Sequence, residues 1–182
     1  MSENPQWEQF LLTALDKYLV KNDFPADANP KALRTLLWRT VCNMSKYADG
    51  QTLVKKLNRE VLTTAAKTLQ DHKTDANLVN AAILALSNSV FIKVACSHLQ
   101  DFVPSAQEQV HKALSENLSS ENENTVLAIL NLFCKFLESW PEYRQLAQGA
   151  ARAEPKTKLD FLKYHKSDGV KLLVEDVFLL LG

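Results

Sequence analysis

The chain has 182 residues, 46% of them hydrophobic, and its 21 lysines and arginines equal its 21 aspartates and glutamates in number. This apolar content excludes an intrinsically disordered chain, and the balanced charge gives no overall attraction to nucleic acid or to an anionic membrane. The length suits one domain with a substantial core. Because glycines are scarce and no long stretch alternates polar and apolar residues, we predict an all-α protein.

The first predicted helix begins near Pro5, a residue suited to the first helical turn, and carries apolar residues at a spacing of three and four as far as Leu19. A loop containing Pro25 follows it. The N-terminal residues lack the basic and apolar regions of a signal peptide, and no apolar run is long enough for a membrane helix. We therefore expect no membrane association. We assign residues 1–182 to one domain, with a leading helix and loop over 1–29 and helical repeats over 30–182.

Three long helices are predicted over residues 30–47, 77–92 and 125–139. Asn29 is a suitable N-cap for the first of them, with Pro30 as its first residue. The second is rich in alanine, leucine, isoleucine and valine on almost all sides, which predicts a central, buried helix. Shorter helices are expected between and after the long ones, over residues 51–57, 58–72, 107–118, 141–148, 156–165 and 170–181.

Polar residues recur at a fixed interval in the three long helices. Asn43, Ser87 and Asn131 are 44 residues apart each time (87 − 43 and 131 − 87). A period of about 40–47 residues built from helices is typical of HEAT and armadillo arrays. No single unit could bury its apolar side alone, whereas stacked units share a continuous core and form an extended surface. We therefore predict an armadillo-like helical repeat stack, an α-solenoid with a concave groove.

The same interval aligns Arg39 with Ile83 and Leu127, and it predicts which polar side chains line the groove. Asparagine has both a donor and an acceptor, so rows of asparagine can hold the backbone of an extended peptide, and the guanidinium of Arg39 suits a carboxylate. The alternative is that each polar residue satisfies a loop or a neighbouring helix of the same protein. The predicted groove residues are Arg39, Asn43, Lys46, Tyr47, Asn80, Ser87, Asn88, Asn131 and Lys135.

The sequence shows no arrangement typical of a catalytic or metal site. Cys42, Cys96 and Cys134 lie in apolar helical stretches, and an odd number of cysteines indicates reduced thiols in a cytoplasmic or nuclear protein. Cys96 and His98 are two residues apart on a predicted helix, so their side chains do not face each other. No CxxC, HExxH or glycine-rich phosphate motif occurs. We expect no enzymatic activity, cofactor, metal or small-molecule substrate.

Four short motifs lie in the first half of the chain. They are an L-R-T-x-C-N-like segment at Trp38–Asn43, G-Q-x-L at Gly50–Leu53, R-E-x-L at Arg59–Leu62, and A-x-L-A-L-x-x-S-V at Ala82–Val90. Together they resemble the PUL domain, which occurs at the C-terminus of the phospholipase-activating protein and its yeast relatives. The resemblance is good over residues 30–92, and the rest of the chain follows the family's layout more loosely.

The resemblance implies an armadillo-like interaction module that binds the acidic, aromatic-containing C-terminal tail of the AAA ATPase valosin-containing protein in a basic groove. It also implies a cofactor role in ubiquitin-dependent protein handling. We expect the protein to be a monomer. Arg39 and Asn43 fall on the family motif. Ser87, which Asn88 follows, occupies a position where relatives can carry asparagine, and Asn131 rests on spacing alone. The alternative is a helical-repeat adaptor for another folded partner.

Overall fold

The computed structural model describes residues 5–47, 58–71, 75–88, 104–139, 141–150 and 155–182, and within these residues every regular element is a helix. One of them, η1, is a π-helix. The elements are α1 (Pro5–Ala14), η1 (Leu15–Val20), α2 (Pro30–Met44), α4 (Asn58–Asp71), α5 (Ala76–Leu86), α7 (Pro104–Asn117), α8 (Glu123–Ser139), α9 (Pro141–Ala150), α10 (Pro155–Leu162) and α11 (Asp168–Leu181).

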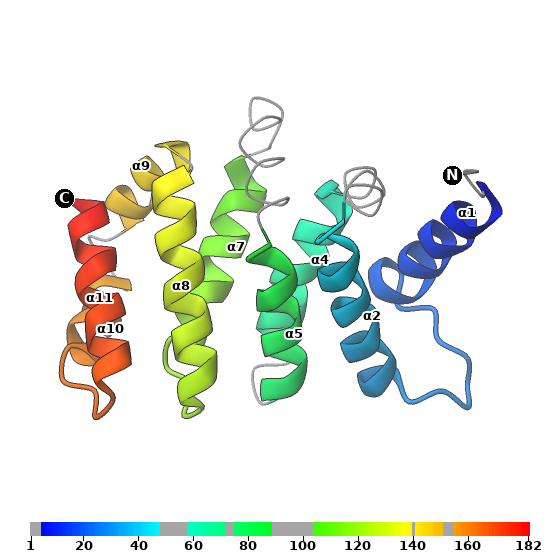
Figure 1. The fold of residues 1–182 in the computed structure, drawn as a ribbon, viewed down its shortest axis with the longest axis horizontal. Coiled ribbons are helices and arrows are strands. Elements are labelled where there is room, and N and C mark those ends of the chain that lie inside the picture. The colour runs from blue at the N-terminus through cyan, green and yellow to red at the C-terminus, as the bar shows by residue number, and fades with distance from the viewer. Residues whose placement is uncertain (1–4, 48–57, 72–74, 89–103, 140, 151–154) are drawn as a thin grey trace.

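The helices form two rows along one axis (Figure 1). α2, α5, α8 and α11 stand side by side in the front row, and α4, α7 and α10 lie behind them. α2 packs along α5, α5 along α8 and α8 along α11, while α4 packs along α7 in the rear row. The two termini lie at opposite ends of the stack. The prediction of an all-α, armadillo-like helical repeat stack is therefore confirmed.

The helix ends follow local capping chemistry. Asn29 is the N-cap of α2, as predicted, because its side-chain oxygen accepts a hydrogen bond from the backbone N–H of Ala32 at 3.1 Å. Asp75 caps α5 in the same way, accepting from the N–H of Leu78 at 3.3 Å. α7 begins at Pro104, a turn earlier than predicted, because proline is tolerated in the first turn of a helix.

Some predictions fall on residues outside the described ranges. These are the helix predicted over 51–57, the end of the helix predicted over 77–92, the motif at Gly50–Leu53, and the pair Cys96 and His98.

The two rows bury one continuous hydrophobic core. Trp38 and Val41 of α2, Leu69 of α4, Leu114 of α7 and Ile129 of α8 are all enclosed in it. Burying a leucine or isoleucine contributes about 1.5–3 kcal/mol, so contact between the rows is the main stabilising term. α5 is the most enclosed helix of the front row, as predicted. Its buried residues are Leu78, Val79, Ala81, Ala82, Ile83, Ala85 and Leu86.

Among the described residues, four side chains donate hydrogen bonds to backbone carbonyls of the preceding unit, and we name them carbonyl clamps. Each donates to a backbone carbonyl in or just after the last turn of a helix in the preceding unit. Carbonyls in a last helical turn lack the full set of partners within their own helix, and the clamps supply donors to them. The clamps are Asn88 Nδ2 to Cys42 O at 2.7 Å, Asn117 Nδ2 to Leu69 O at 2.9 Å, Lys135 Nζ to Ser87 O at 3.0 Å, and Lys158 Nζ to Ser115 O at 3.2 Å.

A polar pair lies in the core at the C-terminal end of the stack. His111 of α7 is 7% exposed, and its Nδ1 lies 2.8 Å from the hydroxyl oxygen of the fully buried Tyr143 of α9. Burial lowers the pKa of His111 to about 4, and it raises the pKa of Tyr143 well above its usual range. Both side chains are therefore uncharged at neutral pH.

The buried clamp Asn117 tests how much the joins between units contribute. Its amide also donates to Ala113 O at 2.8 Å. Replacing it by alanine leaves the carbonyl of Leu69 without this donor in a buried site, so we expect the free energy of unfolding to fall by about 2 kcal/mol. Urea denaturation measures this change. Asn124→Ala makes the same substitution at an exposed position of α8 and should change stability by less than about 0.5 kcal/mol. Equal stability of wild type and Asn117→Ala would contradict the clamp.

His111 predicts a loss of stability as the pH falls from 7.5 to 5. The unfolded chain protonates this residue near pH 6.5 and the folded protein near pH 4. Between these values the unfolded state binds more protons, so acid favours unfolding, by about 2 kcal/mol at pH 5. His111→Gln is polar but does not titrate. The free energy of unfolding of wild type minus that of this variant should therefore be about 2 kcal/mol lower at pH 5 than at pH 7.5. A difference that does not change with pH would overturn the assignment.

Candidate functional site

The exposed sides of α2, α5, α8 and α11 form one face of the stack, which we call the front face (Figure 1). Every predicted groove residue lies on, or directly after, one of the first three of these helices. The face is hollowed between α2 and α5 and again between α8 and α11. We call these two depressions the α2–α5 hollow and the α8–α11 hollow.

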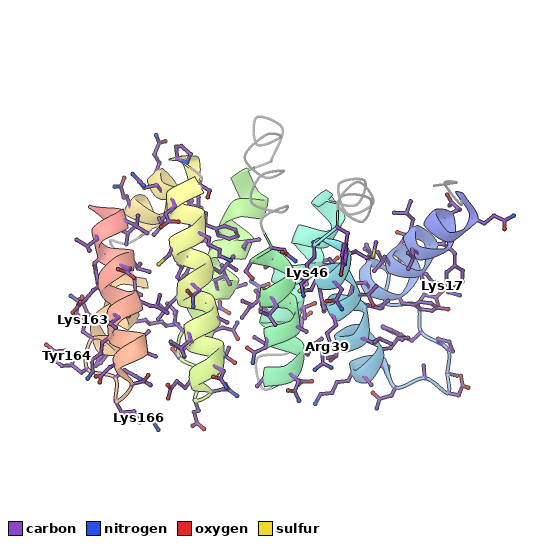
Figure 2. All side chains as sticks on the ribbon, in the orientation of Figure 1. Lys17, Arg39, Lys46, Lys163, Tyr164 and Lys166 are labelled. Carbon is purple, nitrogen blue, oxygen red and sulfur yellow. The ribbon has the colours of Figure 1, made fainter. Side chains whose placement is uncertain are left out.

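The α2–α5 hollow has a volume of about 320 Å³, and polar and charged residues line it together with Cys42, Ala81 and Leu84. Arg39 lies on α2 and Lys46 just after its end, both on the side of α5 (Figure 2). Arg39 is exposed and makes no hydrogen bond or ion pair with the described residues, and the same is true of Asn77 on the facing helix. The lining residues are Arg39, Cys42, Asn43, Lys46, Asn77, Asn80, Ala81 and Leu84.

Positive charge dominates around this hollow. Arg39 also lines an adjoining depression of about 490 Å³ that reaches the start of α2. There Lys31 Nζ lies 3.0 Å from a carboxylate oxygen of Asp75, so this acidic group is already paired. Lys46 Nζ contacts only an amide oxygen, that of Asn43, at 3.3 Å. Arg39 and Lys46 are therefore two cations without a carboxylate partner among the described residues.

The α8–α11 hollow has the opposite character. Its volume is about 460 Å³, and the carboxylates of Glu138 and Asp176 line it together with Asn131 and Lys135. Burial raises the pKa of Cys134 to about 11, and the negative charges of Asp176 and Glu138 add to the shift. The front face is thus basic at its α2–α5 end and acidic at its α8–α11 end.

Several predicted groove residues are engaged within the protein. Asn88 and Lys135 are carbonyl clamps, and Ser87 supplies the carbonyl that Lys135 binds. The side-chain oxygen of Asn80 accepts from the Thr125 hydroxyl at 2.9 Å, which joins α5 to α8. Asn131 Nδ2 donates to Leu127 O of its own helix at 2.9 Å. For these residues the structure describes internal hydrogen bonds, as the alternative interpretation expects.

A constant 44-residue interval does not describe the exposed positions of the front row. It aligns the exposed Arg39 with Ile83, but Ile83 is fully buried. The exposed side of α5 instead carries Asn77 and Leu84, and Arg39, Asn77 and Asn80 line the same hollow. α5 is therefore shifted by about one helical turn relative to the predicted register.

The structure adds Asn77 and Leu84 to the site. Both are exposed, on a helix that is otherwise mostly buried. Their spacing from Asn80, three residues before it and four after it, is the signal that places all three on one side of a helix. Tyr47, just after α2, is 70% exposed, and Leu36 on α2 is 59% exposed. The hollow therefore combines cations and amides with the apolar Leu84, and Leu36 lines the adjoining depression.

The described residues contain no group of three or more histidine, cysteine, aspartate or glutamate side chains positioned to hold a metal ion. In the same part of the chain, no helix combines the length and the apolar character needed to cross a membrane.

No protein-family model and no curated protein matches the chain. Among solved structures, a designed armadillo repeat protein in complex with the peptide (KR)4 aligns over 100% of both chains, with 12% sequence identity and a TM-score of 0.38. At this TM-score the similarity carries no argument, so the fold rests on the helix arrangement itself and the site on its own geometry.

Cys134 tests the acidic character of the α8–α11 hollow. At pH 8 a pKa near 11 instead of 9 leaves about 100-fold less thiolate, so alkylation by iodoacetamide should be correspondingly slower than in the urea-unfolded chain. Asp176→Asn removes one of the charges that raise the pKa and should accelerate labelling. Mass spectrometry across pH 7.5–10.5 gives the rates. Rapid labelling of folded Cys134 at pH 8, unaffected by Asp176→Asn, would contradict this description.

Proposed function

We propose that this protein is a peptide-binding helical-repeat module whose α2–α5 hollow receives an acidic segment of its partner. The observation that carries the proposal is the exposed guanidinium of Arg39, which has no partner among the described residues. It lines a hollow beside Lys46, a second cation, whose ammonium contacts an amide oxygen but no carboxylate among those residues. A guanidinium can bind a carboxylate through two parallel hydrogen bonds. An acidic ligand would supply the partners that the described structure does not.

The amide groups of the hollow suit the backbone of an extended peptide. Asn77 makes no hydrogen bond to the described residues, and Asn80 uses its oxygen for Thr125 while its Nδ2 stays available. Asn43 shares its oxygen with Lys46 and keeps its Nδ2 as a donor. Donors and acceptors of this kind recognise backbone groups whatever the side chains are. The cations would then select for acidic side chains or a terminal carboxylate.

The resemblance to the PUL domain indicates a specific partner. Trp38–Asn43 contains the family motif, and its last residue and Arg39 both line the α2–α5 hollow. We therefore propose that the ligand is the acidic C-terminal tail of the AAA ATPase valosin-containing protein, and that the module is a cofactor in ubiquitin-dependent protein handling in the cytoplasm or nucleus. The acidic residues of the tail should lie at the α2–α5 end, because Glu138 and Asp176 would repel them at the other.

The second candidate is an adaptor for another folded protein. Leu172 and Leu179 on α11 are 62% and 80% exposed, which favours burial against a partner at the C-terminal end of the stack. The two candidates differ in what they require of the ligand. A tail reader binds a short isolated peptide, whereas an adaptor needs the folded partner.

Titration calorimetry with the synthetic C-terminal peptide of the ATPase tests the proposal. We expect binding that weakens when the salt concentration rises from about 50 to about 200 mM, since salt screens exposed charges. Arg39→Glu should weaken binding by at least about tenfold, because it replaces attraction by repulsion.

Lys112→Glu is the matched control. This exposed lysine belongs to α7 of the rear row, so its reversal changes the net charge equally and should leave the affinity within about twofold of wild type. Binding that survives Arg39→Glu unchanged would contradict the assignment of the hollow. Absence of binding at both salt concentrations would leave the adaptor as the better candidate.

A further inference from the structure

A separate cavity of about 360 Å³ lies at the C-terminal end of the stack, among α7, α8, α9, α10 and α11. It shares no lining residue with the α2–α5 hollow or the α8–α11 hollow. The residues that line it include no aspartate, glutamate, lysine or arginine. Most are aromatic or aliphatic, and the main ones are Phe133, Leu137, Tyr143, Leu159 and Phe178.

One polar side chain in this apolar wall is incompletely satisfied. Nδ1 of His111 is engaged by the Tyr143 hydroxyl at 2.8 Å, but its Nε2 is buried and has no hydrogen-bond partner among the described residues. Leaving a buried polar atom unpaired costs about 1–3 kcal/mol, and natural proteins seldom do so without a reason. A ligand group that bonds to Nε2 would remove this cost.

The wall of the cavity is held in place by packing and hydrogen bonding. The ring of Tyr143 packs edge-on against those of Phe136, at 5.0 Å between centroids, and His111, at 5.5 Å. Gln148 Nε2 donates to Leu181 O at 2.6 Å, which ties α9 to the end of α11. Preformed, mostly apolar cavities with one or a few placed polar groups are the usual form of small-molecule sites.

We propose that this cavity binds a small, uncharged aromatic or alicyclic molecule that carries a hydroxyl group, and that the hydroxyl bonds to His111 Nε2. The mostly aromatic and aliphatic lining favours an apolar molecule over an ion. An apolar cavity of about 150 Å³ holds one benzene ring, so the larger volume here suits a molecule of about two fused rings. A hydroxyl both donates and accepts, so it can pair with Nε2 in either tautomer of the imidazole.

The test compares 2-naphthol with naphthalene, which has the same rings but no hydroxyl. We expect saturable binding of one 2-naphthol per chain by titration followed in NMR, with an affinity about tenfold higher than that of naphthalene. The Nε2 resonance of His111 should shift on addition of 2-naphthol, which needs no variant. His111→Phe keeps a ring at this position and should bind the two probes equally well. Lys67→Glu, at an exposed position of α4, should leave binding of both probes unchanged, because no residue of α4 lines this cavity.

Ala147→Phe places a ring in the cavity wall and should abolish binding of both probes, with folding checked by circular dichroism. Three results would each overturn the proposal: no saturable binding up to the solubility limit, equal affinity of the wild type for the two probes, or an unmoved Nε2 resonance when 2-naphthol is bound. Because the peptide titration is a separate measurement at a separate site, failure of one proposal is distinguishable from failure of the other.

Discussion

The joins between units depend on backbone carbonyls at the ends of helices. Each helix leaves its last carbonyls without an internal partner, and in this stack several of these groups lie within reach of side chains of the next unit. Asn88, Asn117, Lys135 and Lys158 supply donors to them from the following unit. Apolar contact gives the stack most of its stability but has little directionality. The clamps are directional, so they fix how far each unit is shifted along its neighbour.

This constraint also determines which polar residues are available for binding. Asn88 and Lys135 donate hydrogen bonds to backbone carbonyls, and the side-chain oxygen of Asn80 accepts one from the Thr125 hydroxyl. Among the described residues that line the α2–α5 hollow, Arg39 and Asn77 are polar side chains that have no partner. Polar residues that look equivalent in the sequence therefore divide into two groups, one that joins units and one that faces solvent. Only the second group can contribute to binding without weakening the stack.

Much of the fold could be predicted from the sequence because helical periodicity and capping are local. The N-cap Asn29 and the nearly complete burial of α5 follow from residues within a few positions of each other. The register between helices could not be predicted in this way. A constant interval aligns Ile83 with Arg39, yet Ile83 is buried and Arg39 is exposed. The interval fails because the clamps and the core packing set the shift of each helix separately. The acidic α8–α11 hollow could not be predicted from the repeat interval either, because Asp176 belongs to α11, a helix outside the repeated pattern.

The central claim is that asparagines on the front row divide into joining and binding residues, and comparing Asn88→Ala with Asn77→Ala tests it most directly. For each variant the free energy of unfolding is measured in urea, and the affinity for the acidic C-terminal peptide by calorimetry. The account predicts that Asn88→Ala lowers the free energy of unfolding by about 1–2 kcal/mol, whereas Asn77→Ala leaves stability unchanged and weakens peptide binding. Loss of stability in Asn77→Ala with unchanged affinity would contradict it.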